Sequence, residues 1–200
     1  MQINTVDKYS VDSIVLDKPK KEEDYYCSKL NFVIQTPKLN ILKLNDKTIS
    51  ILINDKLESL FNSFDKKMIE LISSNSPEYF EESFTVDETE DIYKNSFKFK
   101  KEYNYFTSNV SKKMNIYNKH KDSVNISELG KNDSVICLIK CTKMIFYKTY
   151  CMPYWEIFQI KYKEPVLNTK EYLFIEDLSD NYCEKEEELE TNLKLIKITK

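Results

Sequence analysis

The sequence is poor in the residues on which phosphate-binding loops and metal sites depend. It has one glycine, Gly130, one histidine, His120, and no arginine, so all 30 basic residues are lysines. A single glycine excludes the glycine-rich phosphate loop and the dinucleotide-binding fingerprint. His120 stands in an expected loop without a nucleophile motif, so Ser-His-Asp and Cys-His catalysis are not indicated. We therefore expect a protein that is not an enzyme.

The cysteines fit neither a disulfide framework nor a metal site. They are odd in number and scattered, at Cys27, Cys137, Cys141, Cys151 and Cys183. On a predicted strand, Cys137 and Cys141 would lie about 13 Å apart, which is too far for a shared metal or a disulfide. Both are expected in the core. Reduced thiols are typical of proteins inside cells, and we predict no metal and no cofactor.

Long hydrophobic runs are also missing. No apolar run approaches the roughly 18 residues that span a bilayer, and the N-terminus, Met1 to Lys8, is polar, unlike a secretory leader. A hydrophobic content of 41% predicts a folded core, and 32% charged residues predict solubility. We expect a soluble intracellular protein with no membrane partner.

The net charge of −3 conceals two blocks of opposite sign. Residues 92–148 carry twelve lysines against four acids, a balance of +8, whereas residues 171–190 carry nine acids against one lysine, a balance of −8. Such blocks indicate either a polyanion site with an acidic tail or two solvated surfaces, and composition leaves both open. We predict one domain over residues 1–170, with residues 1–9 mobile, and an acidic C-terminal extension over residues 171–200.

Hydrophobic periodicity predicts antiparallel strands with helices inserted once. An apolar stripe predicts a helix over residues 56–73, capped by Asp55 with Glu58 in the capping-box position. Shorter helices are expected from Ser76 and over residues 85–93. Strands are expected over residues 9–16, 30–36, 39–44, 48–53, 112–117, 135–142 and 154–163, with an interruption at 150–153. The pattern favours an antiparallel barrel of the α+β class. Trp155 belongs either to its core, which we favour, or to a platform for base stacking.

A basic segment interleaved with aromatic residues is the most informative feature. Its lysines are Lys98, Lys100, Lys101, Lys112 and Lys113, and its aromatic residues are Phe97, Phe99, Tyr103, Tyr105 and Phe106. Single-stranded nucleic acid is bound by cations that contact phosphates and by rings on which bases stack. A strand with phenylalanines facing inward and lysines facing outward would give the same pattern, so both interpretations stay open.

Three fragments carry a resemblance to a known family. Residues 31–39 (NFVIQTPKL) resemble a strand followed by "QTP", and residues 129–135 (LGKNDSV) resemble the turn "L-x-K-G-S-x-V". Residues 141–146 (CTKMIF) and 155–161 (WEIFQIK) resemble the ending "C-T-G-I/L-W-F … W-x-V-x-Q-I-K". In order and spacing, the fragments resemble the phage-type single-stranded DNA-binding protein family of nucleocytoplasmic large DNA viruses, the giant viruses.

The resemblance implies an OB-like antiparallel β-barrel with inserted helices and an acidic C-terminal extension. It implies sequence-independent, non-catalytic binding of single-stranded DNA in viral DNA replication or repair, with replication proteins as partners through the extension. The expected address is the host cytoplasm (the viral factory) or the nucleus, and packaging in the virion and a homo-oligomer are compatible with it. The alternative is a virion structural or assembly protein that acts through protein–protein contacts. The expected contact residues are Lys98, Lys100, Lys101, Lys112, Lys113, Lys143 and Lys148, with Tyr103, Tyr105, Phe106 and Tyr147 for stacking.

Overall fold

The computed structural model describes residues 3–110 and 114–163. The chain divides into two units, residues 1–165 and 166–200, and everything described below belongs to the first. The predicted acidic extension, residues 171–200, and two predicted contact residues, Lys112 and Lys113, lie outside the described residues.

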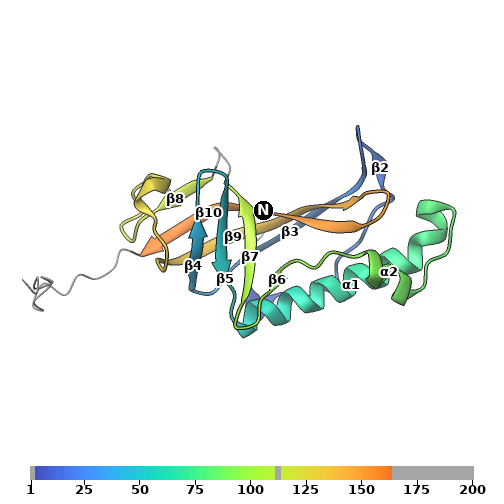
Figure 1. The fold of residues 1–200 in the computed structure, drawn as a ribbon, viewed down its shortest axis with the longest axis horizontal. Coiled ribbons are helices and arrows are strands. Elements are labelled where there is room, and N and C mark those ends of the chain that lie inside the picture. The colour runs from blue at the N-terminus through green and yellow to red at the C-terminus, as the bar shows by residue number, and fades with distance from the viewer. Residues whose placement is uncertain (1–2, 111–113, 164–200) are drawn as a thin grey trace, which may run out of the picture. The chain divides into compact units, whose positions relative to one another are not determined.

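The first unit is a mostly antiparallel sheet with two helices (Figure 1). Its strands are β1 (Asn4–Thr5), β2 (Lys20–Lys21), β3 (Tyr26–Gln35), β4 (Leu39–Leu44), β5 (Thr48–Leu52), β6 (Lys98–Phe99), β7 (Asn104–Asn109), β8 (Asn115–Tyr117), β9 (Ser134–Phe146) and β10 (Cys151–Lys163). The helices are α1 (Asp55–Phe80) and α2 (Val86–Ile92), with short 3-10 turns at Val6–Lys8 and Ile126–Glu128. The strand order is β1-β3-β9-β4-β5-β7-β6, while β10 pairs with the other edge of β9 and β8 pairs with β10.

The predicted barrel is not closed, which corrects that expectation. β9 is shared between two neighbours on one edge, because β4 pairs with Ser134 and Val135 and β3 pairs with the later part of the strand. Within the described residues no strand pairing joins β7 to β10. A side chain bridges this seam instead, since the Ile157 N–H donates to Ser108 Oγ at 3.0 Å. A bulge between Ile157 and Gln159 interrupts the register of β10 at this point.

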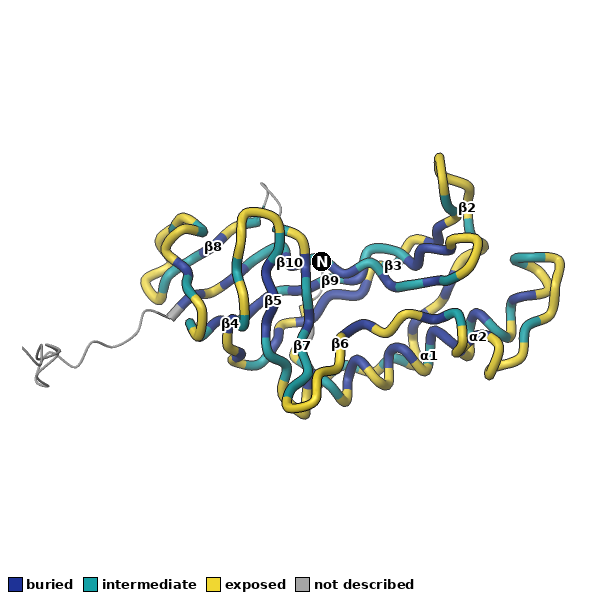
Figure 2. The backbone as a smooth tube through the Cα atoms, in the orientation of Figure 1, coloured by how far each residue is buried: buried dark blue, intermediate teal, exposed yellow. Residues whose placement is uncertain are grey.

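Helix α1 buries the predicted apolar stripe against the sheet. Leu57, Leu60, Phe61, Phe64, Met68 and Ile72 are buried, as the three-and-four spacing predicts (Figure 2). The cap differs from the prediction. Asn54 accepts the Leu57 N–H at 3.1 Å, and Glu58 accepts from the side-chain amide of Asn104 at 2.9 Å. The helix therefore starts on an asparagine cap without the predicted capping box.

α1 also runs through Pro77, where a separate helix is predicted. Proline lacks the N–H that would reach the Ser73 carbonyl four residues earlier. The Ser76 hydroxyl donates to that carbonyl at 2.7 Å and accepts the Phe84 N–H at 2.8 Å. The substitute bond explains why the helix continues to Phe80.

One predicted strand does not form, and another starts earlier than predicted. Residues 9–16 form no strand, although Ile14 and Leu16 are buried and the Tyr9 ring lies 4.1 Å from that of Phe32. Apolar alternation does not distinguish a paired strand from an unpaired segment that packs on a core. At the other end, β10 starts at Cys151 and includes Pro153. The predictions over residues 39–44 and 85–93 are confirmed by β4 and α2.

The centre of the core combines aromatic rings with one buried polar network. Trp155 is 7% exposed, which confirms its predicted place, and its ring lies 4.9 Å from that of Phe64. Its indole N–H donates to Ser96 Oγ at 2.9 Å. Asp65, 6% exposed, accepts from the Tyr93 hydroxyl and the Ser96 N–H, both at 2.8 Å. Burial raises the pKa of Asp65 to about 6, against the lowering effect of these hydrogen bonds.

Candidate nucleic-acid interface

The β6–β7 turn carries the first of two clusters of lysine and tyrosine, which we call the turn cluster (Lys98 to Tyr105). The Lys100 N–H donates to the Tyr103 carbonyl at 2.9 Å, so Lys101 and Glu102 form the exposed tip. The Lys100 ammonium lies 5.4 Å from the centre of the Tyr103 ring and 5.8 Å from that of Tyr105. The Tyr103 hydroxyl raises the pKa of Lys100, so the cation is fully charged at neutral pH.

The second cluster surrounds Lys143 on β9, and we call it the hairpin cluster (Tyr25, Lys143, Tyr147, Tyr150 and Tyr154). The Lys143 ammonium lies 2.8 Å from the Tyr25 hydroxyl, 4.8 Å from the centre of that ring and 5.5 Å from the Tyr154 ring. The bond to Tyr25 raises the pKa of Lys143. Such cation–π contacts hold a lysine in place while its charge still faces water.

Tyrosine rings continue from Lys143 into the β9–β10 turn. The Tyr25 and Tyr147 rings lie 5.7 Å apart, and the Tyr147 and Tyr150 rings are stacked at 4.7 Å. The Tyr147 N–H donates to the Tyr150 carbonyl at 2.9 Å, which closes the turn and holds both rings on it. Tyr147 is 37% exposed, and Lys148 at the tip is exposed.

Further lysines border the hairpin cluster. The Lys94 ammonium lies 6.0 Å from the centre of the Tyr150 ring. Lys29 is exposed and pairs in register with Lys143 across β3 and β9. Lys140, by contrast, forms a salt bridge of 3.3 Å with Glu156. The positive charge at this end of β9 is offset in part by Glu22, which interacts with Lys143, and by Glu23 and Asp24, which line a pocket with Lys148.

The length of helix α1 gives the separation of the two clusters, because each cluster lies near one end of it. The amide of Asn104 in β7 bonds to Glu58 in the first turn of α1, whereas the Phe146 ring lies 5.4 Å from that of Phe80 in its last turn. At about 1.5 Å per residue, these two helix positions are about 33 Å apart. The structure therefore does not join all the predicted residues in one site. Lys98, Lys100, Lys101, Tyr103 and Tyr105 lie in or beside the turn cluster, and Lys143, Tyr147 and Lys148 in or beside the hairpin cluster.

One predicted stacking residue is wrong. Phe106 is 3% exposed and its ring lies 5.6 Å from that of Phe61 in the core. Alternation along β7 turns Phe106 and Ser108 inward and leaves Tyr105 and Thr107 only partly buried. The exposed phenylalanine of this region is Phe99, at 60%, with its ring 4.7 Å from that of Phe97.

Sequence reasoning missed five contributors to the hairpin cluster and its border. They are Tyr25, Lys29, Lys94, Tyr150 and Tyr154. Tyr154 could have been found, because it precedes the inward-facing Trp155 on a strand and must point the other way. Tyr25 gives no local signal, since its partner Lys143 is 118 positions away.

The described part of the chain also bears on the predictions about cysteines, metal ions and membranes. Cys137 and Cys141 are fully buried, which confirms their predicted place in the core. No three metal-ligating side chains gather within residues 3–110 and 114–163. Neither of the two helices described there is long and apolar enough to cross a membrane.

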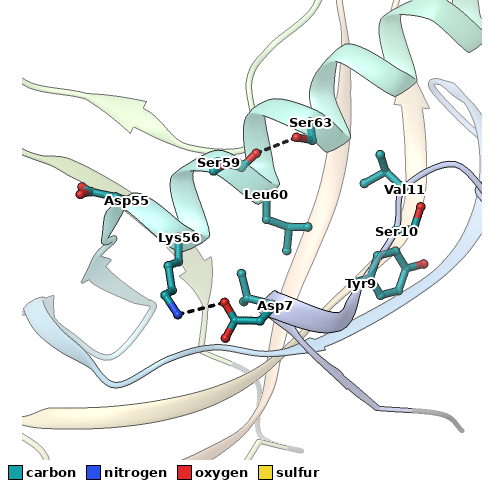
Figure 3. Close-up of a pocket in the computed structure, with 10 residues that line it drawn as sticks. Asp7, Tyr9, Ser10, Val11, Asp55, Lys56, Ser59, Leu60 and Ser63 are labelled. Carbon is teal, nitrogen blue, oxygen red and sulfur yellow. Dashed lines mark hydrogen bonds and ion pairs between the residues drawn. The ribbon is translucent and has the colours of Figure 1, made fainter.

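A cavity of about 570 Å³ lies at the start of α1 (Figure 3). Its lysine, Lys56, forms a salt bridge of 3.0 Å with Asp7, and Asp55 adds another carboxylate. A cavity with this charge does not suit a phosphate, so the candidate interface is formed by the two clusters.

Comparison with known proteins gives only distant likenesses. No family model and no curated protein matches the chain. Similar solved structures include the single-stranded DNA-binding protein from bacteriophage Enc34, with a TM-score of 0.40 at 12% identity over 84% of this chain and 99% of that chain. Its C-terminal truncation gives 0.42 at 11% identity over 75% and 95%, and its complex with single-stranded DNA gives 0.40 at 11% over 77% and 97%. A likeness at this level assigns the present chain to no family.

Proposed function

We propose that this chain binds single-stranded DNA without catalysis and without sequence preference. The observation that carries the proposal is the hairpin cluster, in which Lys143 is held between Tyr25 and Tyr154 beside the stacked Tyr147 and Tyr150. Ammonium groups neutralise phosphates, and an unstacked base can lie on a tyrosine ring. Both elements of single-strand recognition therefore occur on one small surface.

The cations present favour binding that ignores sequence. The chain has no arginine, and the planar guanidinium is the side chain best suited to reading a base edge with two parallel bonds. Lysine is a compact charge that contacts phosphates whatever the base. Ring faces are equally tolerant, because every base has a π-face.

The biological setting is proposed on the sequence fragments alone. The fragments at residues 31–39, 129–135, 141–146 and 155–161 resemble the giant-virus family. We therefore place the activity in viral DNA replication or repair, in the host cytoplasm or nucleus. Partner proteins bound through the acidic extension and a homo-oligomer belong to the same proposal. The alternative, a virion structural or assembly protein, predicts protein contacts and no affinity for DNA.

A fluorescence-anisotropy titration of the full chain with labelled oligo-dT tests the proposal. Affinity should fall as salt rises, with a logarithmic slope of about −0.7 for each phosphate contacted. A duplex of the same length is the control and should bind more weakly, because its bases do not reach the rings. Absence of oligo-dT binding at low salt would show the proposal to be wrong and would leave the assembly alternative.

A further inference from the structure

A groove of about 450 Å³ lies between the end of α1, α2 and the β9–β10 turn. Figure 1 shows α2 alongside the C-terminal part of α1. Its walls are mainly apolar and include Ile72, Phe80, Phe84, Ile92, Phe146 and Tyr150. A cavity of this size and lining can accept large aliphatic side chains.

Hydrogen bonds hold the groove open. Phe84 is fixed on α1 at both backbone groups, because its N–H donates to Ser76 Oγ and its carbonyl accepts from Ser73 Oγ, each at 2.8 Å. On the opposite wall the Lys94 N–H donates to the Cys151 carbonyl at 2.8 Å, which ties the end of α2 to the start of β10. The walls of the groove are therefore formed before a ligand binds, so that binding costs little conformational entropy in the protein.

One rim of the groove is strongly acidic. Residues 81–91 (EESFTVDETED) contain six carboxylates and no lysine, a balance of −6. Glu88 and Asp91 line the groove itself, and Lys148 of the β9–β10 turn is the one lysine among its described lining residues. Hydrogen bonds from the Thr85 N–H and hydroxyl lower the pKa of Glu88, so this group is ionised. Among the salt bridges of the described residues, none involves these six acids.

We propose that this groove is a docking site for a basic, apolar peptide segment of a partner protein. Apolar side chains would occupy the groove while lysines or arginines meet Glu88 and Asp91. A nucleic acid does not fit this rim, because the carboxylates of Glu88 and Asp91 repel phosphates. The groove shares Tyr147, Lys148 and Tyr150 with the proposed DNA interface, so its occupant is distinguished from DNA by contacts with Glu88 and Asp91.

The spacing of the rim favours an extended segment. Glu88 and Asp91 are three residues apart on a helix, which places their Cβ atoms about 5–6 Å apart. Alternate residues of an extended peptide lie about 6.6 Å apart on one side. A sequence alternating lysine with leucine would present lysines to both carboxylates and leucines to the apolar walls.

A titration with two synthetic octapeptides tests the site on the full chain. The probe alternates leucine with lysine, and the matched peptide alternates serine with lysine and has equal charge. By fluorescence anisotropy, the leucine peptide should bind about tenfold tighter, because only it fills the apolar groove. Equal affinities would show adsorption by charge and would overturn the proposal.

Two double variants locate the binding. Glu88→Gln with Asp91→Asn removes the charges facing the groove and keeps a glutamine at the capping-box position. We expect affinity for the leucine peptide to fall about tenfold. The control, Asp46→Asn with Glu70→Gln, removes two exposed carboxylates elsewhere and should leave affinity unchanged. Equal losses in the two variants, or none in the first, would refute the groove as the site. No nucleic acid is present, so the result is independent of DNA binding.

Discussion

Two tyrosine pairs in this domain have similar chemistry and opposite surroundings. Tyr93 donates to Asp65 at 2.8 Å within the core, whereas Tyr25 bonds to Lys143 at 2.8 Å on a solvated surface. Burial raises the pKa of Asp65 to about 6. Lys143 keeps contact with water, and its pKa is raised chiefly by its bond to Tyr25. A buried pair of this kind contributes to the stability and uniqueness of the fold, while an exposed pair is available for a ligand.

The largest difference in stability between the two regions should appear when an aromatic ring is removed from the core. Phe64→Ala should lower the free energy of unfolding by about 3–5 kcal/mol, because Phe64 is fully buried against Phe32 and Trp155. Urea denaturation measures the loss. The matched control is Tyr147→Ala on the surface, which should change stability by less than about 0.5 kcal/mol. Similar losses for both would remove the distinction between the two regions.

Protonation of Asp65 gives the buried network its own pH dependence. A folded-state pKa of about 6, above the ordinary 3.8, means that the folded protein holds this proton more tightly than the unfolded chain. The stability due to this proton is complete below pH 3.8 and is lost as pH rises through about 6. Between pH 4 and 7 the wild type should lose up to about 3 kcal/mol relative to Asp65→Asn.

The measurement for Asp65 is urea denaturation of both proteins at several pH values across this window. Asp46→Asn, at an exposed turn, is the control and should run parallel to the wild type. A constant difference between wild type and Asp65→Asn would mean that the pKa of Asp65 is not raised.

Tyrosine replacements should affect the two regions in opposite ways. Tyr150→Ala should weaken oligo-dT binding by about 1–3 kcal/mol, because one stacking face is lost. Tyr93→Phe should leave DNA affinity unchanged but lower stability by about 1–3 kcal/mol, because Asp65 loses a donor. Anisotropy and urea denaturation on both variants test the pattern. A Tyr93→Phe protein that folds normally but binds DNA poorly would contradict it.

The smallest expected effect separates the two exposed clusters. Lys143→Gln should reduce the magnitude of the salt slope for oligo-dT by about 0.7, the value of one phosphate contact. Lys100→Gln in the turn cluster should have the same effect only if one DNA strand spans the roughly 33 Å between the two clusters. Titrations with short and long oligo-dT distinguish the cases, since a short strand cannot reach both. An unchanged slope for Lys143→Gln would exclude the hairpin cluster.

Much of the fold could be predicted where one local pattern determines one element. The stripe from Leu57 to Ile72 predicts α1, and alternation from Val135 to Cys141 predicts the inward face of β9. Prediction failed where the local structure depends on a contact that the hydrophobic pattern does not show. Ser76 replaces the bond that Pro77 removes, and Tyr9 packs on Phe32 without a neighbouring strand. Whether the barrel closes could not be predicted either, because this depends on how β3 and β4 share one edge of β9.

The candidate site shows the same limit at longer range. Tyr103 and Tyr105 were found because they lie within five residues of Lys100. Tyr25 was missed because only the pairing of β3 with β9 brings it to Lys143. Deciding whether Tyr105 or Phe106 is exposed required knowing which alternate residues of β7 face the core. The sequence of a six-residue strand does not determine this.

Pro153 has a consequence for how copies of this protein behave together. It pairs with Met144 of β9 near the start of β10, and on the other side of β10 the described pairings are with Cys151 and with residues 159–161. Between them the described part of β10 pairs with no strand on that side, and there Ser108 of β7 accepts the Ile157 N–H. Proline offers no N–H there, so an incoming strand would find its ladder broken. The residue predicted to interrupt β10 therefore lies within the strand, at a point where a strand from a second copy could not form a continuous ladder.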